Sequence, residues 1–165
     1  MTPEHITLVQ RSFADVLPMA DTFASLFYAR LFDLDPTLRS LFHGEMREQG
    51  RKLMTMLQLA VTGLHRLEVL VPVVQQLGLR HRAYGVKDAH YATVGAALLW
   101  TLQQGLEERF TPEVQAAWSS AYTLLAETMR AAAPEVAEDV LTEALVGECG
   151  ARTGVSTGHQ DGLSQ

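Results

Sequence analysis

Cysteine is almost absent from this sequence, because Cys149 is the only one among 165 residues. A single cysteine cannot close a disulfide within the chain, and it cannot supply the paired thiolates of a cysteine-based zinc site. Nothing therefore points to an oxidising compartment, and we expect a cytoplasmic protein.

Basic runs and long apolar runs are also missing. The formal net charge is −6, and no cluster of lysine and arginine offers a surface for nucleic acid or for an anionic membrane. The N-terminal MTPEHITLVQ lacks the basic and apolar regions of a signal peptide, and no apolar stretch approaches the roughly 20 residues that cross a bilayer. These absences favour a soluble protein whose ligand is small.

The sequence does contain helical periodicity, since apolar residues recur at intervals of three and four and no segment alternates as a strand would. Three helix starts are marked by a capping side chain directly before a proline, which fits a first turn: Thr2-Pro3, Asp35-Pro36 and Thr111-Pro112. The length and the hydrophobic fraction of 47% suit one domain. We expect an all-α domain over residues 1–133, with about seven helices near 3–17, 19–33, 36–42, 46–64, 67–81, 88–106 and 111–132.

The character of the sequence changes after Pro134. Residues 134–149 have an amphipathic pattern that allows one more helix. Residues 150–165 are rich in glycine, serine and threonine and have almost nothing to bury, so we expect a disordered tail there.

One histidine continues an apolar helix stripe. The stripe of segment 67–81 ends with Val74 and Leu77, and His81 is the next position on it. The imidazole is either a core histidine satisfied by a backbone carbonyl or a ligand directed at a group in the interior. His90 lies beside the following stripe in the first turn of a helix, and we expect a structural or surface role for it.

Two further polar side chains lie among apolar ones. Gln49 falls on the apolar stripe of segment 46–64, and Tyr28 lies beside the aromatic-rich face of segment 19–33. Each has an ordinary interpretation by itself, a glutamine that reaches solvent and a core tyrosine bonded to a carbonyl. One flat, mostly apolar cofactor, held by His81 with the hydroxyl and the amide on its opposite side, would satisfy all three polar groups at once.

Several short motifs stand at consistent spacing: RHRAYGV with HYATVG, DPTLRSLF, and AAWSSAY. On these motifs residues 5–132 resemble bacterial single-domain globins and the globin domain of flavohaemoglobins, and they are also similar to neuroglobin. The resemblance implies a globin fold and haem b as the cofactor. It gives His81, not His90, the role of proximal iron ligand, and it matches Pro36 and Phe42 to the family's interhelical proline and haem-packing phenylalanine.

The resemblance also implies which residues face the haem. Tyr28, Gln49 and Leu53 would form the distal, catalytic side at an open iron position, where neuroglobin-like proteins have a histidine in place of Gln49. We therefore expect a five-coordinate ferrous haem that takes O2, NO and CO and releases O2 slowly. Lys52 would pair with a haem propionate or remain a solvated charge. The cofactor-contacting residues that the resemblance implies are Phe42, Lys52, Leu57, Leu77, Val86, Tyr91 and Val94.

Two departures from flavohaemoglobins bear on activity. Those proteins link the proximal histidine through a tyrosine to a glutamate, which makes the imidazole more electron-donating. Tyr91 matches the tyrosine, but the glutamate position is Ala133, and Glu135 is offset beyond Pro134. We therefore expect the imidazole to donate less electron density to the iron than it does in flavohaemoglobins. The chain also shows no flavin or nicotinamide domain, so we expect turnover to need an external reductase.

The leading hypothesis is a haem globin that binds O2 reversibly and has NO dioxygenase or related redox reactivity when a reductase supplies electrons. We expect a monomer or a weak homodimer. The alternatives are a haem-based gas sensor and, as a third class, a haem-free globin fold that serves as an interaction module.

Overall fold

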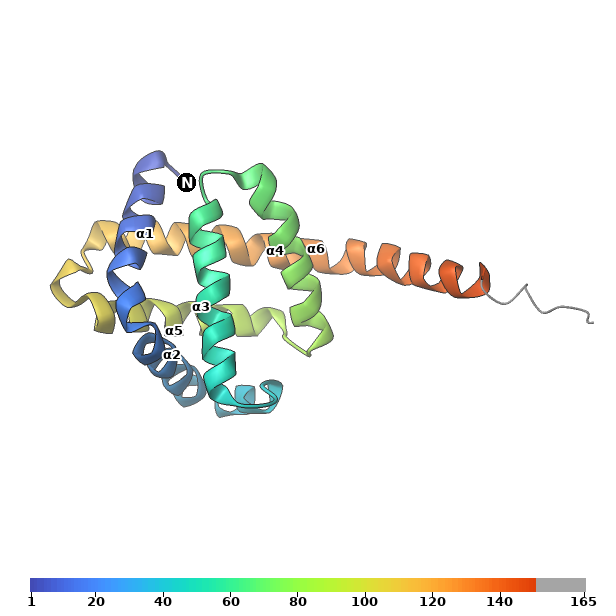
Figure 1. The fold of residues 1–165 in the computed structure, drawn as a ribbon, viewed down its shortest axis with the longest axis horizontal. Helices are drawn as coiled ribbons and strands as arrows, with labels where there is room; N and C mark the ends of the chain where they lie inside the picture. Colours follow the sequence, from blue (N-terminus) through green and yellow to red (C-terminus); the bar gives the residue numbers. More distant parts are fainter. Residues whose placement is uncertain (151–165) are drawn as a thin grey trace, which may run out of the picture. The chain divides into compact units, whose positions relative to one another are not determined.

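The computed structural model describes the backbone of residues 1–150 and the side chains of residues 1–132. Those residues form α-helices and short 3-10 helices and contain no strand, so the prediction of an all-α fold is confirmed. The α-helices, drawn in Figure 1, are α1 (Pro3–Val16), α2 (Ala20–Leu34), α3 (Met46–Gly63), α4 (Leu67–Ala83), α5 (Asp88–Leu106) and α6 (Pro112–Gly150). The 3-10 helices are η1 (Leu17–Met19), η2 (Pro36–Leu41) and η3 (Glu107–Arg109). Segment 36–42, predicted as a helix, is therefore the 3-10 helix η2.

The predicted helix starts are real caps. The Thr2 hydroxyl accepts a hydrogen bond from the backbone N–H of His5 at 3.2 Å. The Asp35 carboxylate accepts one from the N–H of Thr37 at 3.1 Å, at the start of η2. At the start of α6 the N–H of Val114 donates to the Thr111 hydroxyl at 3.3 Å. Each side chain satisfies a backbone donor that has no partner inside its own helix.

The chain divides into two compact units, residues 1–133 and residues 134–165. The segment 134–149, for which the sequence pattern allows one more helix, belongs to α6. The predicted disordered tail lies, apart from Gly150, outside the described residues. No helix among residues 1–150 is both long and apolar enough to cross a bilayer.

The core of the first unit is built from the inner faces of all six α-helices. Its most deeply buried large side chains include Phe23, Leu31 and Leu102. Within the core the indole N–H of Trp118 on α6 donates to the hydroxyl of Ser12 on α1 at 2.8 Å. This bond satisfies two buried polar groups and ties the last helix to the first. In Figure 1, α3 passes across α5 and across the first unit's part of α6, and α4 passes across α6.

Two glycines set how closely α3 and α4 approach their neighbours. A Cβ atom at Gly50 would lie 3.0 Å from the Cβ of Ala24, where α3 crosses α2. A Cβ atom at Gly78 would lie 2.5 Å from the carbonyl oxygen of Met129, where α4 crosses α6. Only a residue without a side chain permits the second approach. The positions of the helices that carry Gln49 and His81 therefore depend on these glycines.

Candidate functional site

His81 lies half-buried in the last turn of α4, and its imidazole is held by its own helix. The Nδ1 atom is 2.8 Å from the carbonyl oxygen of Leu77. A carbonyl oxygen only accepts, so the bond places the proton on Nδ1 and leaves the lone pair on Nε2. Burial lowers the pKa of His81 from its ordinary value, while the bond to Leu77 opposes this shift. The favoured form is a neutral imidazole of fixed tautomer, which is the form that binds a transition metal.

The backbone after His81 is fixed as well. Gly85 has φ +93°, a left-handed conformation that other residues rarely adopt, and it turns the chain at the end of α4. The N–H of Val86 then donates to the carbonyl of His81 at 2.9 Å. The turn holds both the histidine and the half-buried side chain of Val86 in place.

Among the described side chains, no three His, Cys, Asp or Glu residues are grouped so that they would hold a metal ion by themselves. His81 would therefore be a single protein ligand. One histidine suits a metal that brings its other ligands with it, as the iron of a porphyrin does.

The apolar residues predicted to contact a cofactor share an intermediate exposure. They come from the end of η2, from α3, α4 and α5, and from the turn after α4. Each keeps apolar surface that a flat hydrophobic group would cover. The half-buried members are Phe42, Leu53, Leu57, Leu77, Val86 and Val94. Of the remaining predicted residues, Tyr91 is buried and Lys52 is exposed. The residues present thus fit a haem held by His81.

Tyr28 and Gln49 are in contact, and the contact is made by the backbone of Gln49. The Tyr28 hydroxyl donates to the Gln49 carbonyl at 3.2 Å. The Gln49 side-chain amide donates to the carbonyl of His43 at 2.9 Å. Both side-chain donors therefore have backbone partners in this structure. Burial raises the pKa of Tyr28 to about 12, so its hydroxyl keeps its proton at neutral pH.

An aromatic cluster holds the Tyr28 ring. Its centroid lies 5.1 Å from that of Phe27, 6.0 Å from that of Phe32 and 5.3 Å from that of Phe42. The contacts to Phe27 and Phe42 are edge-to-face, a favoured arrangement for aromatic rings. The cluster packs Phe42, the residue that follows η2, against α2. The Tyr28 hydroxyl is the polar group of this otherwise apolar cluster.

Tyr91 does not form a relay that links a histidine to a carboxylate among the described residues. The guanidinium carbon of Arg130 lies 5.8 Å from the centroid of the Tyr91 ring. Tyr122 donates a short hydrogen bond to the Tyr91 carbonyl. Within the described residues the Tyr91 hydroxyl makes no hydrogen bond, and the Nδ1 of His81 bonds to Leu77 instead. Sequence reasoning missed Arg130, although it stands three residues before the position at which the glutamate is missing.

His90 has the structural role that was predicted. Its Nδ1 accepts a hydrogen bond of 2.9 Å from the backbone N–H of Lys87, the residue that caps α5. This bond satisfies one of the unpaired donors at the start of that helix.

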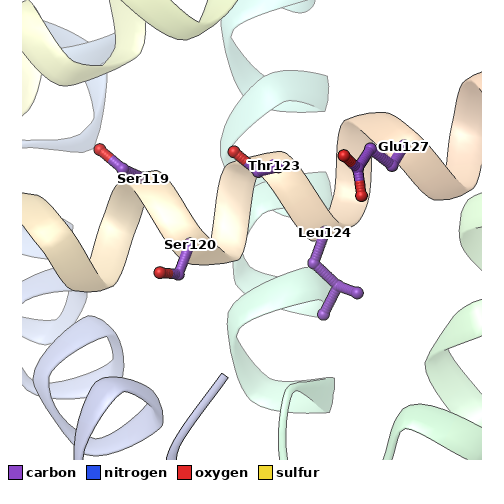
Figure 2. A pocket seen from close by; sticks show the side chains of 5 residues that line it. All are labelled: Ser119, Ser120, Thr123, Leu124 and Glu127. Carbon is purple, nitrogen blue, oxygen red and sulfur yellow. The ribbon is translucent and has the colours of Figure 1, made fainter.

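A cavity of about 530 Å³ opens between α2, η2 and α3, and Tyr28 is part of its wall. A separate hollow of about 390 Å³ lies along α6 and contains none of the predicted site residues. The side chains that line this hollow all come from α6, and they extend from it in different directions (Figure 2). Sequence reasoning missed two arginines of the first cavity, Arg39 and Arg47, because their helices had to be placed before they could be seen to share it.

Comparison with known proteins gives the family. A family model described as Globin matches residues 25–129, which is more than half of the chain. A flavohemoprotein of Bacillus subtilis (strain 168) is 32% identical over 110 residues, covering 65% of this chain and 28% of that protein. A neuroglobin of Tetraodon nigroviridis is 33% identical over 118 residues, covering 63% of this chain and 74% of that protein. A flavohemoprotein of Vibrio cholerae is 28% identical over 130 residues, or 77% of this chain and 33% of that protein. The chain belongs to the globin family.

The flavohemoproteins are much longer than the region they share with this chain. The chain spans 28% of the length of one and 33% of the other, so the similarity concerns one part of each. The similarity to the neuroglobin, in contrast, extends over 74% of that protein.

Proposed function

We propose that this globin binds haem b through His81 and uses the opposite face of the haem for O2, NO and CO. The geometry of His81 carries the proposal. The bond from Nδ1 to the Leu77 carbonyl directs the lone pair to Nε2, the one ring nitrogen left for iron. When bound, haem supplies reversible binding of diatomic gases and one-electron redox chemistry.

The apolar side chains would cover the porphyrin, and Lys52 would provide a charge for a propionate. Phe42, Leu53, Leu57, Leu77, Val86 and Val94 retain the exposed apolar surface that such a cover needs. Lys52 is exposed and makes no ion pair among the described residues, so its ammonium is available to a carboxylate at the haem edge. This contact would be a surface ion pair of small energy.

Tyr28 and Gln49 would donate hydrogen bonds to a bound ligand that carries partial negative charge. Both donors bond to backbone carbonyls in this structure, so a ligand has to compete with those carbonyls. A bond to a charged partner contributes about 1.5–3 kcal/mol, whereas a neutral bond contributes about 0.5–1.5 kcal/mol. The exchange therefore favours the ligand by about 1 kcal/mol for each donor. Leu53 would exclude water from the same side.

NO dioxygenation is the reaction that fits this pocket, with a reductase outside the described residues as the electron source. The reaction combines one NO, one O2 and one electron into nitrate. Two observations favour slow or occasional turnover over a dedicated enzyme: His81 bonds to a neutral carbonyl, and a cation lies over Tyr91. We place the protein in the cytoplasm, as a monomer or a weak homodimer.

The test is a stopped-flow reaction of the full chain. Haem-loaded, reduced protein is mixed with O2 and then with NO, and nitrate is measured. We expect one nitrate per haem in a single turnover, and repeated turnover only when an electron donor is added. A reduced, haem-loaded protein that takes up O2 and yields no nitrate with NO would contradict the dioxygenase part and leave a gas-binding globin.

A further inference from the structure

The cavity between α2, η2 and α3 has a basic wall. Two of its lining residues are Arg39 on η2 and Arg47 on α3, and both side chains are exposed at its edge. Neither forms an ion pair among the described residues. The guanidinium carbon of Arg39 lies 5.5 Å from the centroid of Phe32, another lining residue, so a cation–π contact holds Arg39 against the cavity wall.

The first turn of α3 adds to this positive charge. Met46 and Arg47 are the first two residues of the helix, and both line the cavity. The N–H groups of a first turn have no partners within their helix, and the helix dipole is positive at that end. Among the lining side chains one carboxylate, that of Asp21, opposes the two guanidinium groups, and outside the lining Glu45 and Glu48 flank Arg47 in the sequence. The side chains that line the cavity therefore carry a net positive charge among themselves.

The remaining walls are apolar or uncharged. Ala24, Ala29, Phe32, Met46 and Gly50 supply apolar surface, and Ser25 contributes a hydroxyl. A strongly hydrated anion such as phosphate loses too much hydration energy against such walls. A small, weakly hydrated, singly charged anion loses less, and it gains the attraction of two guanidinium groups and a helix N-terminus.

The cavity also reaches the proposed gas-binding side of the molecule. Tyr28 is part of its wall, and the same side chain donates to the Gln49 carbonyl. A small anion in the cavity would therefore lie next to the residue that we place on the distal side of the haem.

We propose that this cavity is a binding site for small oxyanions of the nitrate and nitrite class, and that it is the route by which they pass to and from the distal side of the haem. The assignment of nitrate as the natural occupant rests on the proposed function. The anion site itself rests on Arg39, Arg47 and the start of α3.

Stopped-flow ligand binding to the full chain tests the route. Azide and nitrite are mixed with the ferric protein, and CO with the ferrous protein, at low ionic strength. We expect R39Q/R47Q to slow the association of both anions about ten-fold, the size of effect that local electrostatic steering produces, and to leave CO association unchanged. D21N should accelerate the anions. R51Q is the matched control, because Arg51 is an exposed arginine of α3 that does not line the cavity.

Two results would overturn the proposal: anion association unchanged in R39Q/R47Q, or an equal slowing in R51Q. Thermal unfolding in sodium nitrate supplies a readout that needs no haem. Nitrate should raise the unfolding midpoint of the parent chain and of R51Q more than that of R39Q/R47Q. If haem does not bind, the proposed function fails, but the nitrate-induced midpoint shifts still test the anion site. Equal shifts in the parent chain and in R39Q/R47Q would show that the site is absent.

Discussion

The imidazole Nδ1 of His81 lies 2.8 Å from the carbonyl of Leu77, one turn earlier on α4. This relationship unites the two interpretations that the sequence left open. His81 is a histidine satisfied by a backbone carbonyl, and that same bond prepares its other nitrogen to bind a metal. The predictions below concern the residues that position this imidazole and the pocket opposite it.

Gly78→Ala should destabilise the protein by about 1–3 kcal/mol, a typical cost of forcing extra atoms into a packed contact. The added Cβ would meet the Met129 carbonyl oxygen at 2.5 Å, so α4 has to move away from α6 and takes His81 with it. Urea unfolding measures the loss, and haem affinity should fall as well. Gln76→Ala is the control, because Gln76 is exposed on the same helix. Equal stability of the two variants would contradict the close approach.

Tyr28→Phe should increase the O2 dissociation rate about three- to thirty-fold, which corresponds to a loss of about 0.7–2 kcal/mol of hydrogen-bond energy. The hydroxyl must leave the Gln49 carbonyl to reach a ligand, so the loss is smaller than a full charged hydrogen bond. Flash photolysis or stopped-flow displacement of O2 by CO measures the rate. Tyr84→Phe changes an exposed tyrosine and should have no effect. An unchanged rate in Tyr28→Phe would remove Tyr28 from the distal side.

Tyr28 should also make the protein sensitive to alkali. Burial raises the pKa of Tyr28 from 10.0 to about 12, so between these values the unfolded chain has lost a proton that the folded chain retains. The free energy of unfolding therefore decreases as the pH rises from 10 to 12, by up to about 2–3 kcal/mol from this residue. Tyr28→Phe should lack this part of the decrease in urea unfolding at the two pH values. A decrease of the same size in Tyr28→Phe and the parent chain would contradict the assignment.

The features that depend on residues close together in the sequence, such as helix caps and helix stripes, were predicted from the sequence. Thr2, Asp35 and Thr111 were predicted to begin helices, and each caps one in the structure. The position of His81 on the stripe of α4 follows from helical periodicity alone. Features that join distant segments were missed, because no local pattern marks them. The approach of Gly78 to Met129 and the cation over Tyr91 depend on how α6 packs against α4 and α5.

The contact between Tyr28 and Gln49 was also predictable from the sequence only in part. Tyr28 and Gln49 were predicted to face one space, and the structure places them in contact. No sequence pattern indicates that the contact is made by the backbone of Gln49, or that the Gln49 amide reaches the carbonyl of His43. Side-chain hydrogen bonds to backbone carbonyls depend on helix placement to a fraction of an ångström.

Arg130→Glu should strengthen the electron donation of His81 to a bound haem through the electrostatic effect of the new carboxylate, because Nδ1 of His81 is bonded to Leu77 and not to Tyr91. The substitution exchanges a cation 5.8 Å from the Tyr91 ring for a carboxylate, which is the charge at the end of the flavohaemoglobin relay. Resonance Raman spectroscopy of the ferrous protein should show a higher iron–histidine stretching frequency, and the reduction potential should fall. Arg130→Gln, which removes the cation alone, should give an intermediate result. Identical spectra in all three proteins would show that Arg130 does not act on the proximal side.

The most direct test of the central claim is a titration of the full chain with haem, followed by the Soret absorbance, in parallel with His81→Ala and His90→Ala. The account predicts tight binding by the parent and by His90→Ala, a large loss of affinity in His81→Ala, and recovery of the parent spectrum when free imidazole is added to His81→Ala. The same affinity and spectrum in His81→Ala and the parent chain, without imidazole, would show that His81 is not the iron ligand.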